Sequence, residues 1–408
     1  MLMDAIERYV CLCGEVSNFT DQLTGIPLVD AYFGPDDLAP SKQNKNRTPD
    51  ELMGDLNDLI DQLTDIQPAL RSKYLIGEVK SIILVIDWLR GTDIPYTNLV
   101  EGLFNIQIEK YSDADIERAK SKVDEALSYS EGTLRQRITH LRSQGEVRGN
   151  ELREVIQNEL QPKSTEVGNQ FKGRIFSQMG IHIMDNGVEY RPITDKPWSG
   201  YNYYQGNFHS VNEFNIDRPM NKYNLLSVVY HEYEHHVSNL WREKAYRDQN
   251  LLDLSVVPLH TGRCVISEGT ADTAKEFVGI LEDDEETRAF QSLRDLSRMV
   301  SINAAILMNQ EGHSVDETAK YISENQFKTE EEALGTISFL CPTNQDGSPN
   351  FWAPYIFTYF IGRTQFVKPT FDSAVRQNRE IEFFNTIYLN PYSGSSVTWT
   401  DAFSWLSQ

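Results

Sequence analysis

Two histidines and a glutamate in one short segment have the spacing of a metal site. His231 and His235 are four residues apart, and Glu232 directly follows the first of them. Residues four apart on a helix share one face, one turn apart, so both imidazoles can bind one Zn²⁺ at about 2.0–2.1 Å. Glu232 is rotated by about 100° from His231, which places its carboxylate beside the metal. The pattern predicts a hydrolytic zinc site in which Glu232 takes a proton from the attacking water.

The residues before this segment indicate that its helix is buried. Residues 225–230 are almost all apolar, and two stacked histidines in a core are costly unless they bind something. His236 is the alternative second ligand, although a residue five positions after His231 lies off the face that it shares with His235. A stripe of solvated histidine and glutamate on an exposed helix is the structural alternative to a metal site.

A third ligand is needed if zinc is to keep a fourth position open for water. Glu268 follows His235 by 33 residues, and Asp272 comes four residues later. We expect Glu268 to bind the metal and Asp272 to accept the remaining ring N–H of a ligating histidine. Ser267 is placed to cap the second helix, and Gly269 permits close packing against the first. A solvated acidic helix face is the alternative for this pair.

These motifs carry a family resemblance. HExxH followed by a Glu-xxx-Asp helix is similar to the gluzincin, or thermolysin-like, zinc metallopeptidases. Three longer strings resemble a narrower, uncharacterised group of bacterial and archaeal zinc peptidases: Asp-Ala-Tyr-Phe-Gly-Pro at 30–35, Lys-Pro-Trp-Ser-Gly-Tyr-Asn at 196–202 and Asn-Ile-Asp-Arg-Pro at 215–219. Many members of that group have wider histidine spacing, whereas this chain has the compact HExxH. We therefore assign the site residues of this chain by their resemblance to gluzincins, and we do not transfer the details of the narrower group.

The resemblance also implies groups that bind the substrate. In gluzincins the edge of a sheet lies beside the metal helix and pairs with an extended substrate. Residues 209–215 occupy the corresponding place in this sequence, and an ordinary structural strand is the alternative.

A helix near the C-terminus supplies candidate donors for the developing oxyanion. Tyr355, Tyr359 and Arg363 are spaced by four residues and share one face. The structural alternative is that these three side chains pack in the core and only their polar ends reach the surface. The Tyr-x-x-Gly string ending at Gly362 resembles the narrower group and points to Tyr359 as the oxyanion donor, with Tyr355 and His260 as alternatives. Arg363 is then expected to bind a substrate carboxylate.

The elements that must position these residues are mostly helical. Residues 1–175 have apolar positions at helical spacing, as in 51–63, 78–89 and 113–127, and are expected to form a helical N-terminal region. Residues 176–408 are expected to form the catalytic domain, with a small antiparallel sheet within 182–216. The predicted class is α+β, mostly helical.

The composition disfavours two classes of binding partner and indicates where the protein is located. The 408 residues include 38 basic and 60 acidic side chains, a net charge of −22, which disfavours nucleic acid and anionic membranes as partners. Four cysteines are too few for a disulfide framework. The first ten residues lack the apolar core of a signal peptide, and no stretch reaches about 20 apolar residues. A cytoplasmic location is expected.

The predicted function is a zinc metallopeptidase with one Zn²⁺ per chain, acting on peptides, chiefly short ones, by a promoted-water mechanism. A zinc hydrolase of another amide or an ester is the alternative enzyme. A non-catalytic, zinc-stabilised binding protein is the alternative outside enzymes. Glu232 counts against the binding protein, because it is not needed to hold zinc and structural zinc sites usually have four protein ligands, chiefly Cys and His.

Overall fold

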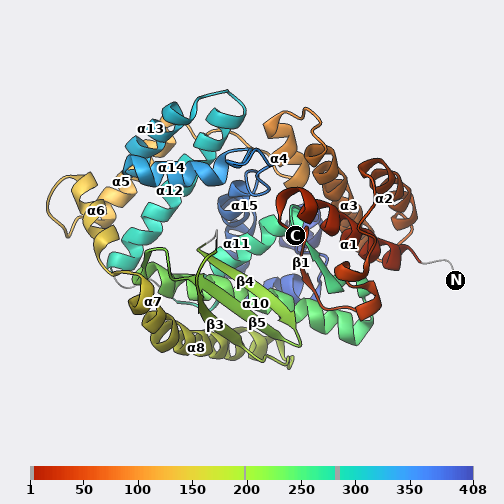
Figure 1. Ribbon diagram of the computed structural model, residues 1–408. Helices are drawn as coiled ribbons and strands as arrows, with labels where there is room; N and C mark the ends of the chain where they lie inside the picture. The colour runs from red at the N-terminus through yellow and green to blue at the C-terminus, as the bar shows by residue number, and fades with distance from the viewer. Residues whose placement is uncertain (1–3, 197–198, 281–284, 408) are drawn as a thin grey trace.

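The computed structural model describes residues 4–196, 199–280 and 285–407 (Figure 1). Helices make up most of this part of the chain, and its strands are short, which confirms the mostly helical α+β class. The α-helices are α1 (Ala5–Thr24), α2 (Pro49–Leu63), α3 (Ala69–Leu89), α4 (Tyr96–Phe104), α5 (Asp113–Ala126), α6 (Leu134–Ser143), α7 (Gly149–Val155), α8 (Gln161–Phe171), α9 (Ser177–Met179), α10 (Lys222–Gln249), α11 (Gly262–Phe277), α12 (Glu285–Asn309), α13 (Val315–Gln326), α14 (Glu330–Leu340), α15 (Ile356–Ile361), α16 (Lys368–Arg376), α17 (Glu380–Phe384) and α18 (Trp399–Ala402). The strands are β1 (Val29–Tyr32), β2 (Glu146–Val147), β3 (Val188–Ile193), β4 (Gly200–Gly206), β5 (His209–Asn215), β6 (Met220–Asn221) and β7 (Val256–Pro258).

The N-terminal helices form where the sequence predicts them. In α2, Leu52, Leu56, Leu59 and Leu63 repeat at helical spacing and are all fully buried. Thr48 and Glu51 form a capping box at its start. The next predicted helix begins earlier than expected, at the start of α3.

The two largest of four apolar cores contain most of the buried apolar side chains in the described part of the chain. One core includes α1–α4 together with β7, α11 and α15, and the other includes α7, α8, α10 and the C-terminal helices. In Figure 1 the first four helices lie at the right, α12–α14 at the upper left and the three-stranded sheet at the bottom. Both cores draw residues from each side of residue 175, and the division into 1–175 and 176–408 stays a prediction.

The three-stranded sheet differs from the expected antiparallel one. Its order is β3-β5-β4, and β5 pairs antiparallel with β4 but parallel with β3. Asn207 and Phe208 both have positive φ, as a two-residue hairpin turn requires, so β4 folds directly back onto β5. The expectation that 209–215 is the edge strand is therefore wrong. That segment is the central strand, and β4 forms the edge.

Two glycines allow α11 to approach the tyrosine-bearing segment closely. A Cβ on Gly269 would lie 2.5 Å from the carbonyl carbon of Gly362, and a Cβ on Gly362 would collide with the carbonyl oxygen of Val265. Gly269 thus packs against the segment after α15, and the expectation that it packs against the first metal helix is corrected. At Gly362 the α15 helix widens into a π-helical turn, η6 (Gly362–Val367).

Candidate metal centre

Helices α10 and α11 lie side by side and bring the three predicted ligands together. His231 Nε2 and His235 Nε2 are 3.1 Å apart. Glu268 Oε2 lies 3.3 Å from His231 Nε2 and 3.7 Å from His235 Nε2. His231 and His235 come from adjacent turns of α10, and Glu268 comes from α11, as the spacing predicts.

These donors fit a zinc ion. Tetrahedral ligands about 2.1 Å from zinc stand about 3.4 Å from each other, and the three observed separations, 3.1, 3.3 and 3.7 Å, lie around that value. Glu268 Oε2 is buried and, apart from the two imidazoles, has no hydrogen-bond donor among the described residues. A buried carboxylate oxygen without a well-formed hydrogen bond is costly, and a cation at this point would remove the cost.

The electrostatics of the centre also favour a cation. Burial works against a charged His231, but Asp272 and Glu268 raise the pKa of His231 to about 10. Burial would favour a neutral Glu268, yet His235 and His231 lower the pKa of Glu268 to about 2. The negative potential that holds a proton on the imidazoles equally attracts a divalent metal, which displaces that proton on binding.

Hydrogen bonds on the outer side of each imidazole fix its orientation. Asp272 Oδ1 lies 2.9 Å from His231 Nδ1, and a carboxylate can only accept, so Nε2 of that ring is left to the metal. Ser267 Oγ lies 3.1 Å from Nδ1 of His235. Ser267 was expected to cap α11, but the helix already begins at Gly262, so the serine lies inside it and orients a ligand instead.

A buried arginine holds Asp272 in place. Arg298 Nη2 lies 3.2 Å from Asp272 Oδ1, and Arg298 Nη1 forms a second, shorter contact with the same carboxylate. Although burial favours the neutral acid, Arg298 and His231 keep the pKa of Asp272 well below its usual range. Asp272 is thus a carboxylate that is available to the histidine.

His236 points away from the metal centre. Its Nδ1 lies 2.8 Å from Ser210 Oγ, and its Nε2 lies 3.0 Å from Asp185 Oδ1. The side chain is fully buried between them. Both ring nitrogens are thus occupied, which leaves His235 as the candidate for the second ligand.

A cavity of about 170 Å³ opens beside the ligands. Glu232 lines it, and no hydrogen bond to the Glu232 carboxylate is recorded within the described ranges. Tyr355 and Tyr359 line it as well. The Tyr355 hydroxyl donates to Glu268 Oε1 at 3.1 Å, whereas no hydrogen bond of the Tyr359 hydroxyl is recorded in the described chain. The other lining residues are Asp30, Gly200, Tyr201, Asn202, His231, His235, Asn239, Leu259, Arg263, Ser267, Glu268 and Trp352.

Two further candidates lie outside this cavity. Arg363 lines a neighbouring pocket, where its Nη1 donates to the Asp272 carbonyl oxygen and its Nη2 to Glu276 Oε1, both at 2.7 Å. Arg363 lies within the π-helical turn η6, where the regular α-helical spacing of Tyr355 and Tyr359 does not continue. His260 is fully buried among aromatic rings, including Phe351, and burial lowers its pKa to about 3.

The sequence patterns did not identify several of the lining residues, among them Asp30, Tyr201 and Arg263. The Tyr201 hydroxyl donates to Asp30 Oδ1 at 2.6 Å. Both residues belong to strings that carried the family resemblance, so that resemblance held a signal for them. Arg263 belongs to no motif, and its place depends on how α11 packs.

Comparisons with known proteins extend only to the fold. No protein-family model matches the chain, and no curated protein matches it. A solved structure from Colwellia psychrerythraea, described as a putative lipoprotein, matches with a TM-score of 0.56 and 15% identity, over 95% of this chain and 69% of that one. A structure from Shewanella oneidensis, described as a putative lipoprotein of unknown function, matches with a TM-score of 0.49 and 12% identity, over 88% and 71%. The chain thus shares the fold of the Colwellia protein.

Proposed function

We propose that the protein is a zinc-dependent peptidase that hydrolyses short peptides, with Glu232 as the general base. One observation carries this proposal: His231, His235 and Glu268 converge within 3.1–3.7 Å on the wall of a cavity. The unpaired carboxylate of Glu232 lines the same cavity. This is the arrangement that metal-assisted hydrolysis requires.

Each residue has a defined role in the proposed reaction. A zinc ion held by the two histidines and Glu268 would lower the pKa of water and polarise the substrate carbonyl. Glu232 takes the proton of the attacking water and passes it to the leaving amine. The free hydroxyl of Tyr359 donates a hydrogen bond to the oxyanion. Tyr355 holds Glu268 through its 3.1 Å hydrogen bond.

The edge of β4 supports peptides as the substrate class. Gly200, Tyr201 and Asn202 are consecutive and all line the cavity. Side chains alternate between the faces of a strand, so three consecutive residues reach one cavity along an edge. The sheet order leaves this edge of β4 without a strand partner in the described structure. An extended peptide can pair there through main-chain hydrogen bonds, with little demand on its sequence.

A non-catalytic zinc site is the less favoured alternative. The described residues bring three ligands together, whereas structural zinc usually has four. A structural site also has no use for an adjoining cavity lined by an unpaired glutamate. A zinc hydrolase of another amide or an ester would use the same centre and differ only in its substrate.

One experiment separates these alternatives. The zinc-loaded protein is incubated with a mixed peptide library, with and without chelator, and the products are identified by mass spectrometry. Cleavage that chelator abolishes is expected, and the Glu232→Gln variant should lose it by at least about 10²-fold while keeping its zinc. Intact peptides alongside hydrolysis of simple amides or esters would favour the second enzyme, and no hydrolysis at all would favour the binding protein.

The location and the excluded partners remain predictions. Among the described helices, none is long and apolar enough to cross a membrane. The matched Colwellia structure is described as a putative lipoprotein. A location outside the cytoplasm is therefore the alternative to the expected cytoplasmic one, and fractionation of the native cells decides between them.

A further inference from the structure

The metal cavity contains a cation whose donors are largely unused. Arg263 lines the cavity, and its Nε is buried without a hydrogen-bond acceptor in the described structure. Its Nη2 makes only long contacts, 3.5 Å to the Pro258 carbonyl oxygen and 4.0 Å to Cys264 Sγ. No ion pair of Arg263 is recorded in the described ranges. A guanidinium offers five N–H donors, so this one can still bind an anion.

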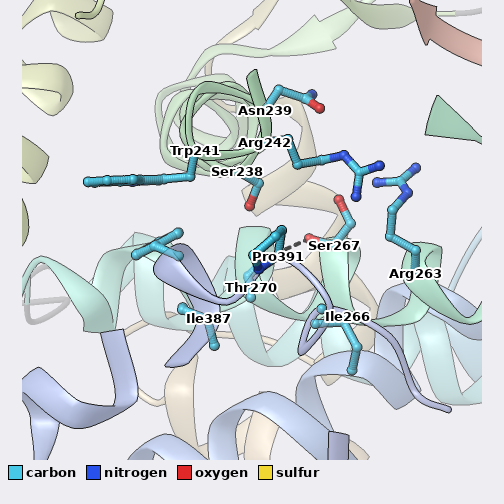
Figure 2. Close-up of a pocket in the computed structure, with 12 residues that line it drawn as sticks. Ser238, Asn239, Trp241, Arg242, Arg263, Ile266, Ser267, Thr270, Ile387 and Pro391 are labelled. Carbon is cyan, nitrogen blue, oxygen red and sulfur yellow. Dashed lines mark hydrogen bonds between the residues drawn. The ribbon is translucent and has the colours of Figure 1, made fainter. Parts of the chain in front are cut away.

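A second arginine adds to the positive charge at this point. Figure 2 shows a small pocket that adjoins the metal cavity and is lined by both Arg242 and Arg263. Arg242 donates to the Tyr74 hydroxyl and to the Val256 carbonyl oxygen, away from the metal cavity. The buried carboxyl of Glu78 is near both arginines. The buried carboxyl of Asp30, in the metal cavity, is also near Arg263 and balances part of its charge. What sets Arg263 apart is therefore its unused N–H donors rather than an excess of charge.

The start of α11 also favours an anion at this point. Arg263 is the second residue of the helix, and the side chain of the N-cap Thr261 makes no capping hydrogen bond. The N-terminus of a helix carries a partial positive charge, and here it lies beside a guanidinium. Ser267 follows Arg263 by one turn, on the same face of the helix, and also lines the cavity.

The position of Arg263 sets its distance from the scissile bond. It precedes Glu268 by five residues on α11, which is about 7.5 Å along the helix axis. An extended peptide advances about 3.3 Å per residue. Because Arg263 and the candidate ligands line one cavity, a carboxylate one or two residues from the cleaved bond is within reach of the arginine side chain.

We propose that Arg263 binds a carboxylate of the substrate, one or two residues beyond the scissile bond. This inference rests on the proposed peptidase function and narrows its substrate class. The carboxylate can be the C-terminus of the peptide, which makes the enzyme an exopeptidase acting near that end, or the side chain of an acidic residue. Arg363, the residue suggested by sequence, already donates to Asp272 and Glu276.

The test compares peptides that differ in one charge. For a peptide cleaved in the library, kcat/KM is measured on the free acid and on its C-terminal amide, and on a pair with Glu or Gln beyond the scissile bond. The natural protein should prefer one carboxylate form by about 10- to 100-fold, the range of a charge-assisted hydrogen bond. A preference for the free acid over the amide would show that Arg263 binds the C-terminus of the peptide and that the enzyme is an exopeptidase. A preference for Glu over Gln would show that Arg263 binds an acidic side chain.

Variants assign the preference to Arg263. Arg263→Gln should lose the preference through a higher KM for the carboxylate form, so that the ratio of kcat/KM between the charged and uncharged partners falls to about 1. Arg263→Lys should keep part of the preference, because it retains the charge without the planar fork. Arg135, at the second position of the exposed helix α6, provides the matched control, Arg135→Gln, which should behave as the natural protein. Zinc content and Tm show that each variant is folded.

The outcomes separate this inference from the function on which it rests. Equal cleavage of charged and uncharged peptides by the natural protein would overturn the role of Arg263 and leave the peptidase intact. An equal loss on both forms in a folded, zinc-loaded Arg263→Gln would also overturn it. If no peptide were cleaved, the proposed function and this inference would both fall.

Discussion

Replacing Asp272 with asparagine removes one charge from the metal centre and little else. The amide keeps the size of the side chain and an oxygen that can accept from His231 Nδ1. It loses the negative charge that makes the imidazole a better ligand and that neutralises Arg298. The Asp272 side chain is completely buried, so water screens neither effect.

The expected magnitude follows from these two contacts. Loss of a carboxylate behind a ligating histidine lowers metal affinity by about 10- to 100-fold, which is about 1.4–2.7 kcal/mol. Removing one partner of a buried ion pair costs up to about 3–5 kcal/mol of folding stability. The isosteric amide can still accept from Arg298, so we expect the lower part of that range for unfolding of Asp272→Asn.

The assay is competition for zinc with a chromophoric chelator, together with urea unfolding of the metal-free protein. Glu276→Gln is the matched control, because Glu276 lies one turn further along α11 and pairs with Arg363, away from His231. Its side chain is 31% exposed, so its zinc affinity should be unchanged and its stability should fall by at most about 1 kcal/mol. Unaltered affinity in Asp272→Asn, or an equal loss in Glu276→Gln, would refute the reasoning.

Three further predictions concern the cavity wall and the core. Tyr359→Phe should lower kcat by about 10²-fold with little change in KM, because an oxyanion donor acts in the transition state; an unchanged kcat in steady-state kinetics would return Tyr359 to a packing role. Gly362→Ala should lower the free energy of unfolding by about 1–3 kcal/mol, because the added Cβ collides with the Val265 carbonyl oxygen; a Tm equal to that of the natural protein would contradict the close approach. Burial raises the pKa of Glu78 from 4.5 to about 7. The folded state therefore holds a proton that the unfolded state releases, and stability should fall by about 3 kcal/mol as pH rises from 4.5 through 7. Glu78→Gln should lack this part of the pH dependence in urea titrations, and equal pH profiles would show that Glu78 is charged in the folded protein.

The centre itself was predictable because helical spacing fixes it. His231 and His235 share a face for any straight helix, and the chemistry of zinc demands a third ligand such as Glu268. Asp272 follows from the same spacing, since it lies one turn beyond Glu268 and reaches the outer nitrogen of His231. These inferences need only local geometry and ligand chemistry.

The surroundings of the centre depend on contacts between distant segments. The order of the sheet places β4 at the edge, and no local pattern in 209–215 distinguishes a central strand from an edge strand. The widened turn at Gly362 redirects Arg363, and it forms where α11 and the segment after α15 are in contact. Arg263 belongs to α11 only because this helix begins more than one turn earlier than a cap at Ser267 would place it. Such features follow from tertiary packing, which overrides local signals.

The most direct test of the account is the zinc content of the purified protein and its ligand variants, measured by elemental analysis after dialysis against metal-free buffer. The natural protein should hold about one Zn²⁺ per chain, and His231→Ala, His235→Ala and Glu268→Ala should each hold almost none. His140→Ala, on the exposed surface of α6, should hold as much as the natural protein. A full equivalent of zinc in the Glu268 variant, or no zinc in the natural protein after loading, would contradict the assigned centre.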